Sequence, residues 1–484
     1  MKKFKIALLI VLSILIVPSC SDDLDDNPIA SSSINDFIWK AMNVFYLYKD
    51  DVPDLANDRF ATDSEYNTYL DGFDTPEAIF DNLIFQPGVI DRFSFLVDNY
   101  IELEQLFAGV TKNHGMEFGL IFFPGSDFNV FGYVRYVLPG TDAESKGVQR
   151  GMIFNTIDGV QITADNFSDL LEPESYTIGL AMFDGTTITP TSDTIDLTKV
   201  EYTENPIFIS ETLNVEGQNI GYLMYNGFTA NFDSQLNAAF AGFASNGITD
   251  LVIDFRYNPG GSVFTAITLS SLITGQFTGE VFTTEQWNSD NQAFFEANDP
   301  NRLINLFIDE TRNGANLNSL NLNRVYILTT RSSASASELV INGLNPYIDV
   351  VQIGGTTRGK FSASTTLYDS SDFGRSGANP NHTYAVQPLI LKSINVNGVT
   401  DYFDGLAPDT ELFEDYSNLG SLGDINEPFL AEALAQITGS GRSSQRPFEV
   451  LKELSNRKAM IPHSDELIYD LPLPKEFLKL DFYK

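Results

Sequence analysis

Two residues of this chain, Ser335 and Lys360, could together form a nucleophile and its base. Ser335 stands where an apolar run at 325–330 changes into a helical pattern at 335–344. Lys360 comes shortly after a second apolar run at 349–353. A serine hydroxyl is a poor nucleophile unless a base removes its proton. A lysine can be that base only when its amine is neutral, and burial against apolar side chains favours the neutral form. The two residues therefore predict serine–lysine hydrolase chemistry if the chain brings them together.

A purely structural role for Ser335 is the alternative to this interpretation. Glu338 follows three residues later, which is the spacing of a helix capping box. Histidine is the more usual base for a serine, but the chain has only three histidines and none stands beside a Gly-x-Ser-x-Gly elbow. The absence of such an elbow favours Lys360 as the base.

An acyl-transfer site also needs N–H donors that face the developing oxyanion. The Ala336 amide is one candidate, because it lies at the start of the expected helix, beside the nucleophile. The turn at 258–261 offers a second, since Gly260 and Gly261 have no side chains and let the backbone approach a substrate closely. The alternative for this turn is a simple strand-ending turn.

The segments around these residues alternate between strand and helix patterns. Apolar runs at 220–228 and 250–255 predict strands, and the runs at 262–272 and 335–344 predict helices. Such alternation predicts parallel βαβ units. Upstream of these, residues 115–200 contain short runs of β-forming residues broken by glycines, and a helical pattern begins near Phe37.

The first twenty residues form a separate unit. Three lysines precede an apolar run at 6–17 that is too short for a comfortable bilayer span but suits a signal peptide. Cys20, the only cysteine, ends a stretch that resembles a bacterial lipobox, so no intramolecular disulfide is possible and lipidation of Cys20 is expected. Acidic residues follow, as in the export tag of surface lipoproteins of Bacteroidetes-type bacteria. We expect an outer-membrane lipoprotein, periplasmic or surface-exposed, with membrane contact only through its lipid; the alternative is an ordinary secretory signal.

The formal charge of the chain is −36. Such an excess of carboxylates argues against nucleic acids and anionic lipid surfaces as partners. The sequence shows no His, Cys, Asp and Glu cluster with the spacing of a metal site and no glycine-rich phosphate loop. We therefore expect neither a metal nor a cofactor.

Residues 136–162 resemble the core of a PDZ domain, in which a Pro-Gly turn, a short helix, a strand and an Asp-Gly hairpin follow one another. The preceding Phe118, Gly119 and Leu120 resemble the loop whose backbone N–H groups capture the terminal carboxylate of a peptide. Met152 stands where relatives usually carry aspartate. The alternative is a generic β-rich linker domain.

The motifs DFRYNPGGS, SASASE and TTRGK, in this order and spacing, resemble those of the C-terminal processing, or tail-specific, serine peptidases. The likeness extends over about 32–437 and includes DYFDGLAPD at 401–409 and a closing helix at 424–437. It implies an α/β fold with a ClpP/crotonase-like peptidase core of βα units, an inserted PDZ-like β-rich domain and a small N-terminal helical domain. By position, Ser335 matches the nucleophile, Lys360 the base and Glu338 a supporting polar group. The Gly260, Gly261 and Ala336 amides match the oxyanion hole.

One residue departs from the family pattern. Many relatives carry a glutamine four residues after the lysine, which orients its amine, and this chain has Ser364 there. The resemblance implies an endopeptidase that cuts unfolded or tail-exposed polypeptides captured by the PDZ-like domain. The alternative is a catalytically silent lipoprotein that binds peptides or apolar ligands. The expected segments are a signal peptide (1–19), a tether (20–33), a helical domain (34–110), a PDZ-like domain (111–200), the peptidase core (201–438) and a C-terminal extension (439–484).

Overall fold

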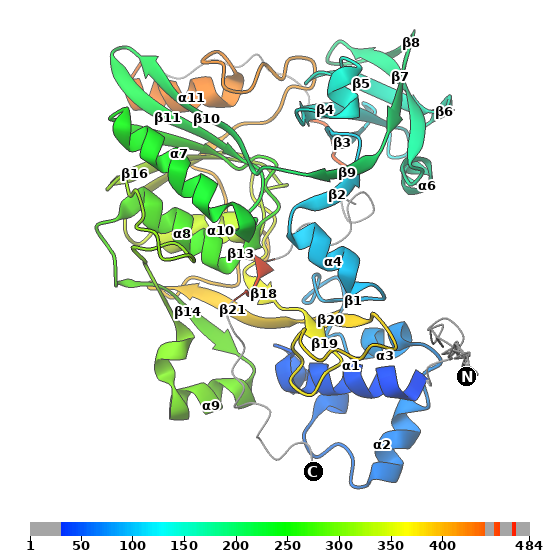
Figure 1. Cartoon of the computed structure of the whole chain (residues 1–484). Coiled ribbons are helices and arrows are strands. Elements are labelled where there is room, and N and C mark those ends of the chain that lie inside the picture. Colours follow the sequence, from blue (N-terminus) through cyan, green and yellow to red (C-terminus); the bar gives the residue numbers. More distant parts are fainter. Residues whose placement is uncertain (1–30, 441–449, 455–466, 471–484) are drawn as a thin grey trace, which may run out of the picture.

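The computed structural model describes residues 31–440, 450–454 and 467–470. The expected signal peptide with Cys20, almost all of the tether and most of the C-terminal extension lie outside these residues. The described chain is a mixed α/β protein with a helical N-terminal region, a β-rich region and a larger core (Figure 1), which confirms the predicted fold class. None of the helices in these three stretches combines the length and apolar character that crossing a bilayer requires.

The core is organised around a six-stranded sheet in the order β10-β11-β12-β16-β17-β22. Strand β10 is antiparallel to β11, and the remaining neighbours are parallel, as the alternation of strand and helix patterns predicts. The central strands are mostly apolar because helices cover both of their faces. The strands are β10 (Ile207–Val215), β11 (Gln218–Tyr225), β12 (Asp250–Asp254), β16 (Arg324–Thr329), β17 (Asp349–Gly354) and β22 (Thr410–Glu411).

Helices lie on the two faces of this sheet. Successive side chains of a strand point to opposite faces, so Leu251 and Ile253 of β12 join one apolar cluster while Val252 joins another. The first cluster includes helices α7 (Asp233–Ser245), α8 (Val263–Thr274) and α10 (Ala336–Leu344). The second includes α11 (Pro428–Thr438), which lies on the other side of the sheet in Figure 1.

A second sheet crosses the lower part of the core in Figure 1, in the order β13-β23-β18-β21-β14-β15. It joins segments from distant parts of the sequence, and helix α9 (Ser289–Asn298) follows strand β14. Strand β23 belongs to the C-terminal extension and lies between β13 and β18. The strands are β13 (Gly261–Ser262), β23 (Leu467–Ile468), β18 (Ser362–Ser364), β21 (Leu389–Asn395), β14 (Val281–Trp287) and β15 (Ile304–Leu306).

The N-terminal region is mainly helical and is attached to the core through a small sheet. Phe37, Ala41 and Phe45 of the first helix are buried at the spacing that predicts a helix with one apolar face. Strand β1 (Phe95–Val97) pairs with β20 (Ala385–Gln387), which also pairs with β19 (Leu367–Tyr368). The helices are α1 (Ser31–Phe45), α2 (Asp63–Leu70), α3 (Pro76–Asn82) and α4 (Tyr100–Phe107).

The β-rich region has its own apolar core. Its sheet follows the order β3-β4-β5-β7-β8, with β6 paired to β5, and a two-stranded ribbon of β2 and β9 leads into and out of it. The elements are β2 (Val110–Asn113), β3 (Met116–Phe122), β4 (Val130–Val137), α5 (Asp142–Ser145), β5 (Ile153–Ile157), β6 (Val160–Gln161), α6 (Phe167–Leu171), β7 (Ser175–Phe183), β8 (Ile188–Thr198) and β9 (Val200–Thr203).

Candidate active site

Ser335 occupies the junction between strand β16 and helix α10. It is the N-cap of the helix and has φ 63° and ψ −112°, a left-handed conformation that costs free energy in a residue with a side chain. The side chain is fully buried. Its hydroxyl oxygen has no hydrogen-bond partner among the described residues. A buried hydroxyl without a partner on a strained backbone is costly unless it serves another purpose.

The Glu338 carboxylate connects the two predicted catalytic segments. Its Oε2 accepts the backbone N–H groups of Ser335 and Lys360, each at 2.8 Å. Its Oε1 accepts the Gly359 N–H and the Thr357 hydroxyl, each at 2.6 Å. Burial raises the pKa of Glu338, although these hydrogen bonds act in the opposite direction. The backbone N–H groups of Ser335 and Lys360 therefore donate to the same carboxylate oxygen, which holds the two residues next to each other.

The capping box expected at this helix start is made only in part. Ser335 and Glu338 occupy its two positions, and the carboxylate accepts the Ser335 N–H. The Ser335 hydroxyl makes no hydrogen bond in return. The capping interpretation therefore explains Glu338 but not the serine hydroxyl.

Lys360 is fully buried. Its Nζ lies 4.6 Å from the centroid of the Phe93 ring. Phe93 packs in turn with Leu47 and Leu389. The lysine amine thus lies close to an aromatic ring of the N-terminal region.

A glutamine reaches Ser364 from a different strand. Gln387, in β20, donates from Nε2 to the Ser364 hydroxyl at 3.1 Å. Its Oε1 accepts the Thr366 hydroxyl at 2.6 Å, which fixes the orientation of the amide. No sequence pattern pointed to Gln387, because it comes 23 residues after Ser364 in the chain.

The turn at 258–261 lies directly against Ser335. A Cβ on Gly260, which has φ 116°, would lie 2.5 Å from the Ser335 Cβ and 2.7 Å from its Oγ. Only glycine fits here, because such contacts are too close for any side chain and this φ disfavours one. The predicted glycine turn is thus placed against Ser335.

The expected role of the Gly260 amide requires a correction. This N–H donates to the Asn258 side-chain oxygen at 2.9 Å, so it is engaged and cannot also serve an oxyanion in this conformation. Asparagine side chains characteristically bond to the backbone two residues later, and the Asn-Pro-Gly sequence could have signalled this. Gly261 is paired with Leu467 of β23. The Ala336 N–H belongs to the first turn of α10, where amides have no acceptor within the helix.

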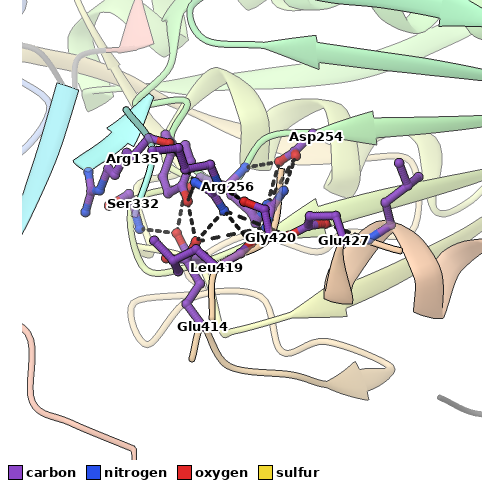
Figure 2. Close-up of polar contacts among 12 residues, drawn as sticks. Arg135, Asp254, Arg256, Ser332, Glu414, Leu419, Gly420 and Glu427 are labelled. Atoms are coloured by element: carbon purple, nitrogen blue, oxygen red, sulfur yellow. Dashed lines mark hydrogen bonds and ion pairs between the residues drawn. The ribbon is translucent and has the colours of Figure 1, made fainter. Parts of the chain in front are cut away.

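A buried cation anchors the segment before this turn. Arg256 is fully buried and forms ion pairs with Asp254 and Glu427, each at 2.6 Å. Burial alone would raise the pKa of Asp254, but the Arg256 guanidinium outweighs it and holds the pKa below its ordinary value. Figure 2 shows Arg256 between these carboxylates, with Glu414 and Arg135 nearby. The network ties the end of β12 to the start of α11.

The predicted peptide-binding residues lie in a strand and not in a loop. Phe118, Gly119 and Leu120 belong to β3 and pair with β4. The reason is local, because the residues at 116–122 are mostly β-forming and apolar. Gly119 is needed for packing, since a Cβ there would lie 2.3 Å from the Tyr133 ring. Strand β3 is an edge strand of its sheet.

Two cavities lie between this strand and the glycine turn. The larger has a volume of about 640 Å³ and is lined by residues that include His114, Phe118 and Arg135. The smaller, about 130 Å³, is lined by residues that include Gly260 and Gly261. Both are lined by Leu106, Thr111 and Glu117. The two cavities therefore adjoin and link the β-rich region to the turn beside Ser335.

His114 lines the larger cavity and is held neutral. Its Nδ1 accepts the Met116 N–H at 3.1 Å, so the ring proton is on Nε2, 2.5 Å from the Tyr176 hydroxyl. Burial, together with Lys199, lowers the pKa of His114 to about 4. The unfolded chain, in which the pKa is near the usual value of about 6.5, therefore binds a proton first as the pH falls.

We expect acid to destabilise the protein through His114. Between pH 7 and pH 4.5 the free energy of unfolding should fall on the order of 2–3 kcal/mol more in the natural chain than in His114→Gln. The reason is that, below about pH 6.5, the unfolded chain binds a proton at His114 and the folded chain does not. Urea unfolding at both pH values measures this. An equal loss in the two proteins would show that the histidine is not held neutral.

Within the described parts of the chain, no group of three or more His, Cys, Asp and Glu side chains could share a metal ion. The site combines a buried serine at a helix start, a buried lysine and one carboxylate that joins them. A serine paired with a lysine is one of the arrangements found in serine peptidases.

Comparisons with known proteins agree with this class. The model of "Peptidase family S41" matches residues 219–378, and that of "Peptidase S41 N-terminal domain" matches residues 33–95. Both stretches are therefore similar to peptidase family S41, in line with the resemblance of the motifs to C-terminal processing peptidases.

Individual relatives support the same assignment. The chain is 28% identical over 235 residues to the carboxy-terminal-processing protease of Bartonella bacilliformis, covering 47% of this chain and 48% of that protein. It is 27% identical over 135 residues to the chloroplastic C-terminal processing peptidase of Tetradesmus obliquus, covering 25% of this chain and 29% of that protein. The chain thus spans about half or less of the curated relatives it matches. The crystal structure of a candidate S41 protease from Bacteroides fragilis aligns with a TM-score of 0.64 and 26% identity, covering 86% of this chain and 98% of that one.

Proposed function

We propose that the protein is a serine endopeptidase that uses Ser335 as nucleophile and Lys360 as general base. The observation that carries this proposal is the Glu338 carboxylate, which binds the backbones of both residues through one oxygen atom. Residues that share an acceptor in this way keep a fixed relative position, which is what a catalytic pair requires.

The chemistry follows from the arrangement. The Lys360 amine takes the proton of the Ser335 hydroxyl as its oxygen attacks the scissile carbonyl. The Ala336 and Gly261 amides stabilise the oxyanion of the tetrahedral intermediate. The protonated lysine then returns its proton to the leaving amine, and an acyl-enzyme remains. Water, activated by the same amine, hydrolyses this ester and restores the free serine.

We propose that the substrate is an unfolded or tail-exposed polypeptide that the β-rich region captures. The outer edge of β3 can pair with an extended chain, as PDZ domains do. The adjoining cavities support delivery from this edge to Gly260 and Gly261, because both are lined by Leu106, Thr111 and Glu117. A chain end held at β3 would therefore have a route to Ser335.

A serine-reactive fluorophosphonate probe tests the proposal. In the presence of an unfolded polypeptide, the full chain should gain one phosphonyl group on Ser335, measured by mass spectrometry. The Ser335→Ala variant should gain none. The polypeptide is included from the start, because substrate binding completes the catalytic arrangement in many enzymes. A natural chain that stays unlabelled under these conditions would instead support the silent peptide-binding alternative.

A further inference from the structure

Two pieces of the C-terminal extension lie on the surfaces that the proposed function assigns to a substrate. Residues 450–454 run along the outer edge of β3, where the Phe122 N–H donates to the Lys452 carbonyl at 3.0 Å and the Leu454 N–H to the Leu120 carbonyl at 2.9 Å. Ile121 and Glu453 face each other in antiparallel register. This is the strand addition by which peptides join a sheet edge.

The second piece fills the space between the glycine turn and the strand after Lys360. Strand β23 runs parallel to β13, with Gly261 opposite Leu467, and parallel to β18, with Ser364 opposite Ile468. The Tyr469 N–H donates to the Ser364 carbonyl at 2.8 Å. Strands β13 and β18 are joined in one sheet only through β23. Figure 1 shows β23 in red at the centre of the molecule, beside β13 and β18.

Side chains of this second piece contact buried residues of the core. Tyr469 is 2% exposed, and its ring meets the Trp287 ring edge to face with centroids 5.5 Å apart. Ile468 lines the cavity beside Gly260 and Gly261. The occupant is thus fixed by both main-chain and side-chain contacts, as a bound peptide is.

Asp470 is held by an acid-binding site at the start of helix α8. The Ser262 hydroxyl donates to Asp470 Oδ2 at 2.6 Å, and the Phe264 N–H donates to Oδ1 at 3.3 Å. The Arg312 guanidinium forms an ion pair with Oδ2 at 2.5 Å. Arg312 also lies 3.7 Å from Asp233. Amides at a helix start and a guanidinium both favour a carboxylate.

We propose that residues 467–470 occupy the surface between β13 and β18 where a substrate binds. We also propose that Ser262 and Arg312 select a substrate with an acidic side chain at the position that Asp470 takes. The proposal rests on the proposed function, because it takes this surface to be the one that binds a substrate. A segment of the same chain competes at a high effective concentration, so the substrate must displace it. The full burial of Ser335 and the engaged Gly260 amide fit a resting site of this kind.

A binding experiment tests the proposal without requiring catalysis. The full chain with Ser335→Ala is compared with the same chain carrying also Tyr469→Ser and Asp470→Lys, which removes the buried ring and reverses the charge beside Arg312. The probe is a fluorescent peptide, Leu-Ile-Tyr-Asp-Leu-Pro, that copies residues 467–472, and fluorescence anisotropy measures its Kd. We expect the probe to bind at least about tenfold more tightly once the occupant is weakened.

Controls separate occupancy from acid selection. Lys452→Ala removes a surface ion pair of the tail, whose lysine side chain is 69% exposed, and should leave the Kd unchanged. In the weakened chain, a probe with asparagine in place of aspartate should bind about tenfold less tightly, and Arg312→Ala should abolish this preference. Equal probe affinity in the two main proteins would overturn the occupancy, and equal affinity for both probes would overturn the acid selection. Neither result bears on the fluorophosphonate test.

Discussion

Replacing Lys360 with methionine is expected to reduce kcat/KM for an unfolded polypeptide by about 10²–10⁴-fold, the range that general-base catalysis contributes. Methionine fills a similar volume beside Phe93 but cannot accept a proton from the Ser335 hydroxyl. The backbone N–H of residue 360 should still bind Glu338, since this contact does not involve the side chain. Cleavage of a quenched fluorescent polypeptide measures the loss, and unfolding in urea shows whether the fold is retained.

Lys392 provides the matched control for this variant. It lies in β21, in the sheet that contains β18, but its amine forms a partly exposed ion pair with Asp401 at 3.0 Å. Lys392→Met removes a lysine amine from the strand next to β18 and leaves Ser335 and Lys360 unchanged. We therefore expect kcat/KM to stay within about twofold, as for the loss of a surface ion pair. Near-natural turnover by Lys360→Met, or an equal loss in both variants, would remove Lys360 from the mechanism.

The sequence predicted those parts of the site that depend on local patterns. The change from apolar strand to helix placed Ser335 at the helix start, and the three-residue spacing to Glu338 predicted a contact that the structure contains. The requirement for an oxyanion hole and the resemblance of the motifs assigned the glycine turn to the neighbourhood of the serine. Each inference used residues close in sequence or a motif whose order is specific.

The remaining parts of the site depend on contacts between distant residues. Phe93 reaches Lys360 from the N-terminal region, and Gln387 reaches Ser364 from a strand paired with β1. Strand β23 is too short for a reliable pattern, so nothing in residues 467–470 predicts their place between β13 and β18. Such pairings are fixed by the packing of the whole chain and leave no periodic signal in any one segment.

Replacing Arg256 with methionine is expected to lower the free energy of unfolding of the core by about 3–5 kcal/mol, because buried Asp254 loses its cation and Glu427 keeps only the more distant Arg150, at 3.8 Å. The side chains of Arg256 and Asp254 are 0% exposed, and that of Glu427 is 1% exposed. The chain has two tryptophans, so a Trp39→Phe background leaves Trp287 as the fluorescent reporter of the core. Urea unfolding followed at this residue measures the loss.

Further variants separate the loss of charge pairing at Arg256 from the loss of its packing. Arg324 lies in the same central sheet and pairs with Asp250 at 2.7 Å, but its side chain is 40% exposed, so Arg324→Met should cost less than about 1 kcal/mol. Adding Asp254→Asn and Glu427→Gln to Arg256→Met should restore part of the stability, since neutral amides are less costly to bury than unpaired carboxylates. If the added substitutions only deepen the loss, the cation acts through its packing and hydrogen bonds, and charge pairing is not the main term.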